Sequence, residues 1–167
     1  MSERGKRIVE QSGARAVADL AERSLLASVE LTAAPERVFR ALASKEIIAW
    51  WINPGVFNTA DWSGDVKVGG RWKASGVGRG RAYGLEGEFR EIDAPRKLVH
   101  TWSAVGAPAA PSTVTYFLEP AARGTRLTLR QEGFAAREIC LATCVGWETS
   151  FEQLALFLSA EVADAPA

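Results

Sequence analysis

The hydrophobic period of the sequence changes from two to 3.6 residues after Gly133, and this change constrains the fold more than any other feature. Before it, apolar and polar residues alternate in short runs separated by turn signals, which is the pattern of half-buried β-strands. After it, apolar residues recur every three or four positions over about 25 residues, which predicts one long helix. Strands joined by such short turns are antiparallel neighbours. The sequence therefore predicts an α+β domain in which one antiparallel sheet packs against a C-terminal helix.

Two short helices are expected between the first strand and the rest of the sheet. Residues 25–31 alternate in the manner of a strand. Pro35 suits the first turn of a helix, where its missing N–H is no loss, and Ser44 can cap a second helix that Pro54 and its neighbours end. The element order is then one strand, two short helices, more strands and one long helix.

Six further strands are expected in the middle of the chain, each bounded by glycine- or proline-rich turns. They cover residues 65–68, 71–77, 81–92, 97–105, 112–119 and 125–132. Apolar residues before position 24 have mixed helical spacings, which predicts a helical or frayed extension over residues 1–23. The domain itself is placed at 24–162 and a disordered tail at 163–167.

The composition of the chain restricts the classes of partner that we expect. A chain of 167 residues is one ordinary domain, and 20 basic residues balance 20 acidic ones. A nucleic-acid-binding protein usually has a basic excess, so we expect no nucleic acid partner. No apolar run approaches the roughly 18 residues that span a bilayer, so no membrane insertion is expected. Cys140 and Cys144 stand four apart in the predicted helix, unlike a secreted disulfide framework, which favours a cytoplasmic location. The oligomeric state is left open.

Several short motifs occur in one collinear series. They are Pro35-Glu36-Arg37-Val38-Phe39, Ile48-Ala49-Trp50-Trp51, Asp65-Val66-Lys67-Val68-Gly69-Gly70-Arg71-Trp72, Pro95-Arg96-Lys97-Leu98-Val99-His100-Thr101-Trp102, Gly124-Thr125-Arg126-Leu127-Thr128-Leu129 and Gly146-Trp147. The series resembles the SRPBCC (START-like) superfamily over about residues 24–160, and in particular proteins similar to the activator of heat-shock-protein ATPase.

This resemblance implies a helix-grip fold, in which a curved seven-stranded antiparallel sheet grips the C-terminal helix and a cavity lies between them. It also implies ligand binding, because relatives bind lipids, hormones or polyketides in that cavity, and some are cyclases or aromatases. The family has no universal catalytic motif, so no catalytic residue is carried over.

Aromatic residues gather where the sheet must meet the long helix, because strand alternation places them on the apolar face. Two interpretations stay open: the rings fill the space as core, or they line a ligand-sized cavity with apolar bodies and polar tips. The candidate cavity-lining residues are Trp50, Trp51, Trp72, Tyr83, Phe89, His100, Trp102, Tyr116, Trp147 and Phe151.

Two single residues carry further alternatives. Gly146 interrupts the long helix, where glycine costs up to about 1 kcal/mol relative to alanine, so it marks either close packing or room for a ligand. His100 is the only histidine. It is either a core residue bonded to a neighbour or a proton donor or acceptor for a ligand. With one histidine and no CxxC or HExxH pattern, we expect no metal and no cofactor.

The sequence thus predicts that a small hydrophobic or aromatic molecule binds between the sheet and the helix. One alternative is a cyclase- or dehydratase-type enzyme acting on a polyketide-like substrate, with His100 and Tyr83 or Tyr116 as general acid–base groups. Another is a co-chaperone-like module with a chaperone as its protein partner, which only the relatives' name suggests.

Overall fold

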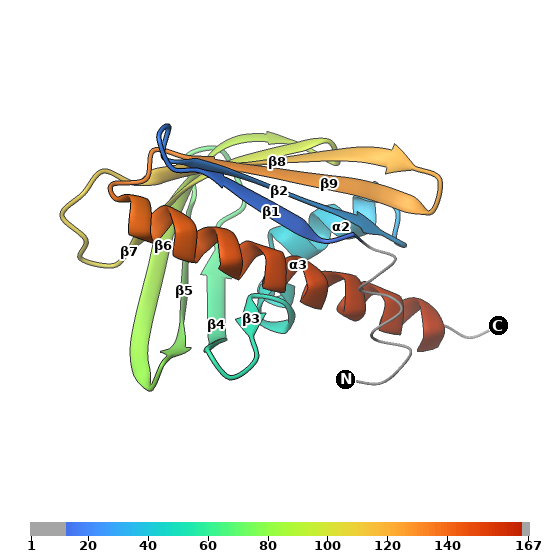
Figure 1. Ribbon diagram of the computed structural model, residues 1–167. Coiled ribbons are helices and arrows are strands. Elements are labelled where there is room, and N and C mark those ends of the chain that lie inside the picture. The colour runs from blue at the N-terminus through green and yellow to red at the C-terminus, as the bar shows by residue number, and fades with distance from the viewer. Residues whose placement is uncertain (1–12, 165–167) are drawn as a thin grey trace.

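The protein is a single curved antiparallel sheet folded around one long helix, as a computed structural model that describes residues 13–164 shows (Figure 1). The sheet has nine strands in the order β1-β2-β9-β8-β7-β6-β5-β4-β3. The strands are β1 (Arg15–Asp19), β2 (Ser24–Leu31), β3 (Ile52–Asn53), β4 (Phe57–Gly64), β5 (Arg71–Gly78), β6 (Arg81–Asp93), β7 (Lys97–Ala104), β8 (Ser112–Ala121) and β9 (Gly124–Glu132). The helices are α2 (Pro35–Leu42), the 3₁₀ helix η1 (Lys45–Ala49) and α3 (Arg137–Asp164).

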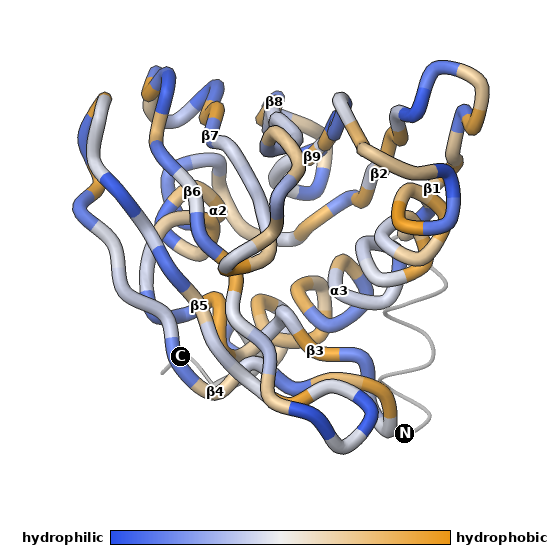
Figure 2. The backbone as a smooth tube through the Cα atoms, turned by 90° about the vertical axis from the view of Figure 1, so that its left-hand side faces the viewer, coloured by the Kyte–Doolittle hydropathy of each residue, from blue (hydrophilic) through white to orange (hydrophobic). Residues whose placement is uncertain are grey.

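The sheet bends far enough for both of its edge strands to reach α3. In Figure 2 the strands form an arc about the helix, and β1 and β3 lie at the two ends of that arc. The strand register shifts between Thr59 and Asp61 in β4 and between Phe89 and Glu91 in β6. Such bulges bend a strand and increase its twist, which helps the sheet close around the helix.

The two short helices follow from local signals that the sequence shows. Pro35 stands in the first turn of α2, and Ser44 caps η1 by accepting a hydrogen bond from the backbone N–H of Glu46 at 3.2 Å. Arg37 of α2 then binds Glu46 and also Glu161 of α3, where the Nε–Oε2 distance is 2.8 Å. These ion pairs fix α2 and η1 beside the C-terminal half of α3.

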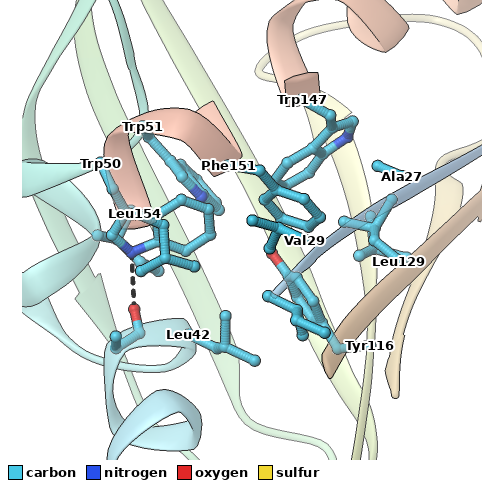
Figure 3. Packing of buried hydrophobic residues seen from close by; sticks show 14 of the residues in the cluster. Ala27, Val29, Leu42, Trp50, Trp51, Tyr116, Leu129, Trp147, Phe151 and Leu154 are labelled. Atoms are coloured by element: carbon cyan, nitrogen blue, oxygen red, sulfur yellow. Dashed lines mark hydrogen bonds between the residues drawn. The ribbon is translucent and has the colours of Figure 1, made fainter. Parts of the chain in front are cut away.

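The core lies between the concave face of the sheet and α3. Figure 3 shows Phe151 and Leu154 of α3 packed among Trp50, Val29 and Tyr116, all of them buried. Trp50 is fully buried and donates its indole N–H to the carbonyl oxygen of Ala41 at 2.9 Å. The arrangement fits the helix-grip fold that the sequence resemblance implies.

The number of strands differs from the expected seven. The short strand expected at 65–68 is a turn, in which Lys67 N bonds Asp65 O at 2.9 Å and Val68 is exposed. The strand in this region is β4, at residues 57–64. Its bulge breaks the strict alternation by which a strand is recognised in a sequence. β3 has only two residues, too few to leave any pattern.

The ends of the chain also differ from expectation. The helical or frayed extension expected over residues 1–23 is wrong for residues 15–19, which form β1 and pair with β2 in the register Val17 to Leu26. The inward positions Ala16 and Ala18 are small, so their alternation with Val17 gave a weak signal. Residues 1–12 of that prediction lie outside the described residues. At the other end, α3 continues to Asp164, so the expected tail is helical at 163–164, and 165–167 lie outside the described residues.

Candidate ligand-binding cavity

A cavity of about 430 Å³ lies between the N-terminal half of α3 and the part of the sheet formed by β4, β6 and β7. Six aromatic residues line it: Trp51, Phe57, Tyr83, Trp102, Phe134 and Trp147. Exposed residues of α3 and of the loop 105–111, among them Ile139 and Ala107, also line it. The cavity therefore opens to solvent between this loop and the first turns of α3. Its volume is within the range of small-molecule sites.

The ten aromatic and histidine candidates divide into two groups. Four line the cavity: Trp51, Tyr83, Trp102 and Trp147. The other six are at most 3% exposed and pack in the core beside it: Trp50, Trp72, Phe89, His100, Tyr116 and Phe151. Of the ten candidates, four thus lie on the cavity wall and six belong to the packed core.

The structure adds lining residues that the sequence pattern did not indicate. Phe57 and Thr59 come from β4, the strand that was not expected, and Ser112 and Ser150 supply hydroxyl groups. The alanines of the loop 105–111 complete the rim. Of these residues, only Ser112 has a signal in the sequence, because it is a polar residue at an inward position of a strand.

Trp147 is held at the cavity wall by a chain of buried hydrogen bonds. Its indole N–H donates to Gln131 Oε1 at 2.7 Å, and Gln131 Nε2 donates to Ser112 Oγ at 2.8 Å. Ser112 Oγ donates in turn to the carbonyl oxygen of Trp102 at 3.2 Å. Because an indole nitrogen can only donate, it fixes which way the Gln131 amide faces. Each side chain in this series of hydrogen bonds has a partner, so the cavity wall is rigid on this side.

A second pair of polar groups, Thr59 and Tyr83, lies on the sheet side of the cavity. Thr59 Oγ1 donates to the carbonyl oxygen of Trp51 at 2.8 Å and is 2.8 Å from the Tyr83 hydroxyl. Tyr83 reaches Thr59 across Gly76, which is paired with both residues in the sheet. A Cβ at Gly76 would stand 2.8 Å from the Tyr83 oxygen and 2.1 Å from Asn58 O, so only glycine leaves room for this contact. Burial raises the pKa of Tyr83.

His100 does not line the cavity. It is 3% exposed, and its Nδ1 lies 2.9 Å from the carbonyl oxygen of Thr101, to which it donates. Burial lowers the pKa of His100 to about 4, so the ring is neutral at pH 7. Among the described residues that line the cavity, Tyr83 is the only one with an ionisable side chain. General acid–base chemistry by His100 in this cavity therefore has no geometric support.

Tyr116, the other acid–base candidate, is fully buried and also lies outside the lining. Burial raises the pKa of its hydroxyl well above the ordinary value, and the neighbouring Trp51 indole offsets part of this effect. The hydroxyl and the Trp51 N–H nevertheless have no hydrogen-bond partner within the described part of the chain. Tyr116 is therefore a core residue with an unpaired polar atom.

The surroundings of Gly146 distinguish between close packing and open space as the reason for a glycine at this position. A Cβ at this position would stand 3.7 Å from Cε1 of Phe57, which is ordinary van der Waals contact, and no backbone of another element lies within 4 Å of it. Close packing of a second backbone is therefore not its reason. Gly146 lines the cavity, and its missing side chain adds to the open space between α3 and Phe57.

The remaining titratable groups form no further centre in the described residues. Cys140 and Cys144 are buried free thiols, and Cys140 Sγ donates to the carbonyl oxygen of Ser24 at 3.4 Å. Within residues 13–164, no three His, Cys, Asp or Glu side chains come together as metal ligands.

Neither described α-helix combines the length and the apolar character needed to cross a membrane.

Sheet, helix and cavity together define a helix-grip protein with an open internal cavity, and comparison with known proteins specifies the family. Residues 32–159 match the family described as activator of Hsp90 ATPase homolog 1-like protein. The chain belongs to this family, within the SRPBCC superfamily. No curated protein sequence matches the chain.

Several solved structures share this fold. A protein from Rhodobacter sphaeroides is 23% identical with a TM-score of 0.73, covering 88% of this chain and 99% of its own. A protein from Mycobacterium smegmatis is 22% identical with a TM-score of 0.72, covering 87% and 97%. The AHSA1 protein from Silicibacter pomeroyi is 26% identical with a TM-score of 0.68, covering 83% and 99%. The first two likenesses show the fold alone.

Proposed function

We propose that the protein binds a small hydrophobic or aromatic molecule in the cavity between α3 and the sheet. The observation that carries the proposal is the cavity itself: about 430 Å³, walled by aromatic rings and open to solvent. Sites for small molecules combine an apolar wall with a few fixed polar groups. Here Thr59 and Tyr83 on the sheet and Ser150 on the helix are such groups.

The local structure supports binding because the wall is formed before a ligand arrives. Trp147 is held by Gln131, and Tyr83 is held by Thr59 across Gly76. A ligand that enters does not have to order these side chains, so less of its interaction energy is lost to conformational entropy. Gly146 leaves space in the helix that side chains could have filled.

The experiment that tests this proposal is a thermal-shift screen with a library of apolar and aromatic compounds, followed by native mass spectrometry of the hits. We expect compounds that raise the melting temperature and remain bound at one molecule per chain. Gly146→Leu, which directs a side chain toward Phe57, should abolish the shifts. Val145→Leu adds bulk at the neighbouring position, which is exposed and does not line the cavity, and should leave the shifts unchanged.

Two results would contradict the proposal. One is a library in which no compound binds the wild-type protein. The other is a set of hits that bind Gly146→Leu as well as they bind the wild type, because those compounds would occupy a different surface.

A further inference from the structure

The polar atoms of the cavity differ in what they can offer a ligand, and Tyr83 is restricted to one role. The hydroxyl of Thr59 has a single hydrogen, and the carbonyl oxygen of Trp51 can only accept it. The 2.8 Å contact between Thr59 Oγ1 and the Tyr83 hydroxyl is then a hydrogen bond only if Tyr83 donates. The phenol hydrogen is thereby used within the protein. What Tyr83 presents to the cavity is an oxygen that accepts.

Ser150 supplies a second, independent polar group from the opposite wall. The residue is 3% exposed and lines the cavity on α3. Its hydroxyl makes no hydrogen bond to any of residues 13–164, whereas Thr143 and Thr149 on the same helix each bond the carbonyl four residues earlier. A hydroxyl on the cavity wall that has no partner among these residues can bond a polar atom of a ligand.

Among residues 13–164, the cavity is lined by no charged side chain that could receive an ion. Among its lining residues only Tyr83 can ionise, and its pKa is raised, so it is neutral at pH 7. A carboxylate, phosphate or ammonium group placed against these aromatic rings would lose its hydration without gaining a counter-ion. Charged ligands are therefore disfavoured inside the cavity.

We infer that the cavity selects uncharged apolar molecules that carry a hydrogen-bond donor, a hydroxyl or N–H group, which the Tyr83 oxygen accepts. This inference rests on the function proposed above and specifies the chemical class of its ligand. It excludes purely hydrocarbon ligands as the preferred class, and it also excludes ligands whose acidic group must enter the cavity.

Three biphenyls that differ at one group form the test: 4-phenylphenol, which donates a hydrogen bond; 4-methoxybiphenyl, which cannot; and biphenyl-4-carboxylate, which is charged. Dissociation constants are measured at pH 7 by isothermal titration calorimetry. We expect the phenol to bind about 3- to 10-fold more tightly than the methyl ether, the range of one net hydrogen bond. The carboxylate should bind at least about 10-fold more weakly than the phenol.

The two tyrosines of the chain provide a matched pair of variants. Tyr83→Phe removes the accepting oxygen, so the preference of the phenol over the ether should fall to within about twofold. Tyr116→Phe makes the same change in the core, away from the cavity, and should keep the full preference. Since the comparison is a ratio of two ligands on one variant, a general loss of stability does not imitate it.

Thr59→Val tests the assigned direction of the hydrogen bond. Without an acceptor at position 59, the Tyr83 hydroxyl is free to donate to the ether oxygen, so the ratio should move toward the methyl ether. If the wild type binds the biphenyls without preferring the neutral phenol, or if Tyr83→Phe keeps that preference, the inference is overturned while the proposed function stands. If none of the three binds, the inference is overturned as well, and the proposed function is then decided by the compound library.

Discussion

Replacement of Gly146 by alanine should make the protein more stable, which is the reverse of what a tightly packed helix glycine would give. The position is in the interior of α3, where alanine is favoured over glycine by up to about 1 kcal/mol. The new Cβ would stand 3.7 Å from Cε1 of Phe57, an ordinary contact that requires no movement. We therefore expect the free energy of unfolding to rise by about 1 kcal/mol, which for a chain of this size is a melting temperature about 2–4 °C higher.

The assay is urea denaturation of the ligand-free protein followed by circular dichroism, with the melting temperature measured in parallel. Gly76→Ala is the contrasting control, since its Cβ would stand 2.1 Å from Asn58 O and would also displace the Tyr83 hydroxyl. Overpacking of this kind costs about 1–3 kcal/mol. If Gly146→Ala is destabilised as Gly76→Ala is, the space beside Gly146 is filled and the argument for an open cavity is refuted.

Three further predictions concern buried groups around the cavity. Burial lowers the pKa of His100 from its ordinary 6.5 to about 4 in the folded state, so protonation favours the unfolded chain. The free energy of unfolding should therefore fall by about 2 kcal/mol between pH 7 and pH 5. Denaturation curves of His100→Gln measured at the two pH values should not show this fall. Gln131→Leu leaves the Trp147 N–H without its acceptor and should lower the free energy of unfolding by about 1–3 kcal/mol in urea denaturation, whereas an unchanged value would show that the bond is replaced. Glu148 accepts a hydrogen bond from the backbone N–H of Ala16 at 3.0 Å, so Glu148→Ala should speed hydrogen exchange in β1 and leave β8 unchanged; equal protection in β1 would show that strand pairing alone holds this edge.

The long-range order of the fold could be predicted because it depends on strong periodic signals. The alternation in β2 and in β5 to β9 and the helical period of α3 each extend over several residues, and Pro35 and Ser44 mark the two short helices. The edges of the sheet could not be predicted from pattern. β1 alternates small alanines, and β3 has two residues, so pairing with neighbouring strands decides their conformation rather than their own sequence.

The cavity was predictable only in part, for a different physical reason. Alternation identifies which face of a strand a side chain occupies, but not whether the opposite side chains meet across the space. Trp102 and His100 occupy the same face of β7, yet Trp102 lines the cavity and His100 is packed against Trp72 with ring centroids 5.1 Å apart. The distinction depends on the curvature of the sheet, which the bulges in β4 and β6 help to set.

The most direct test of the cavity is a crystal structure of the protein soaked with 4-(4-bromophenyl)phenol, in which anomalous scattering locates the bromine without reference to the protein. The account predicts a bromine peak in the space lined by Phe57, Gly146 and Trp147, with the ligand hydroxyl within hydrogen-bonding distance of the Tyr83 oxygen. A structure with no peak there, and with the rings of Phe57 and Trp102 closed over that space, would contradict it.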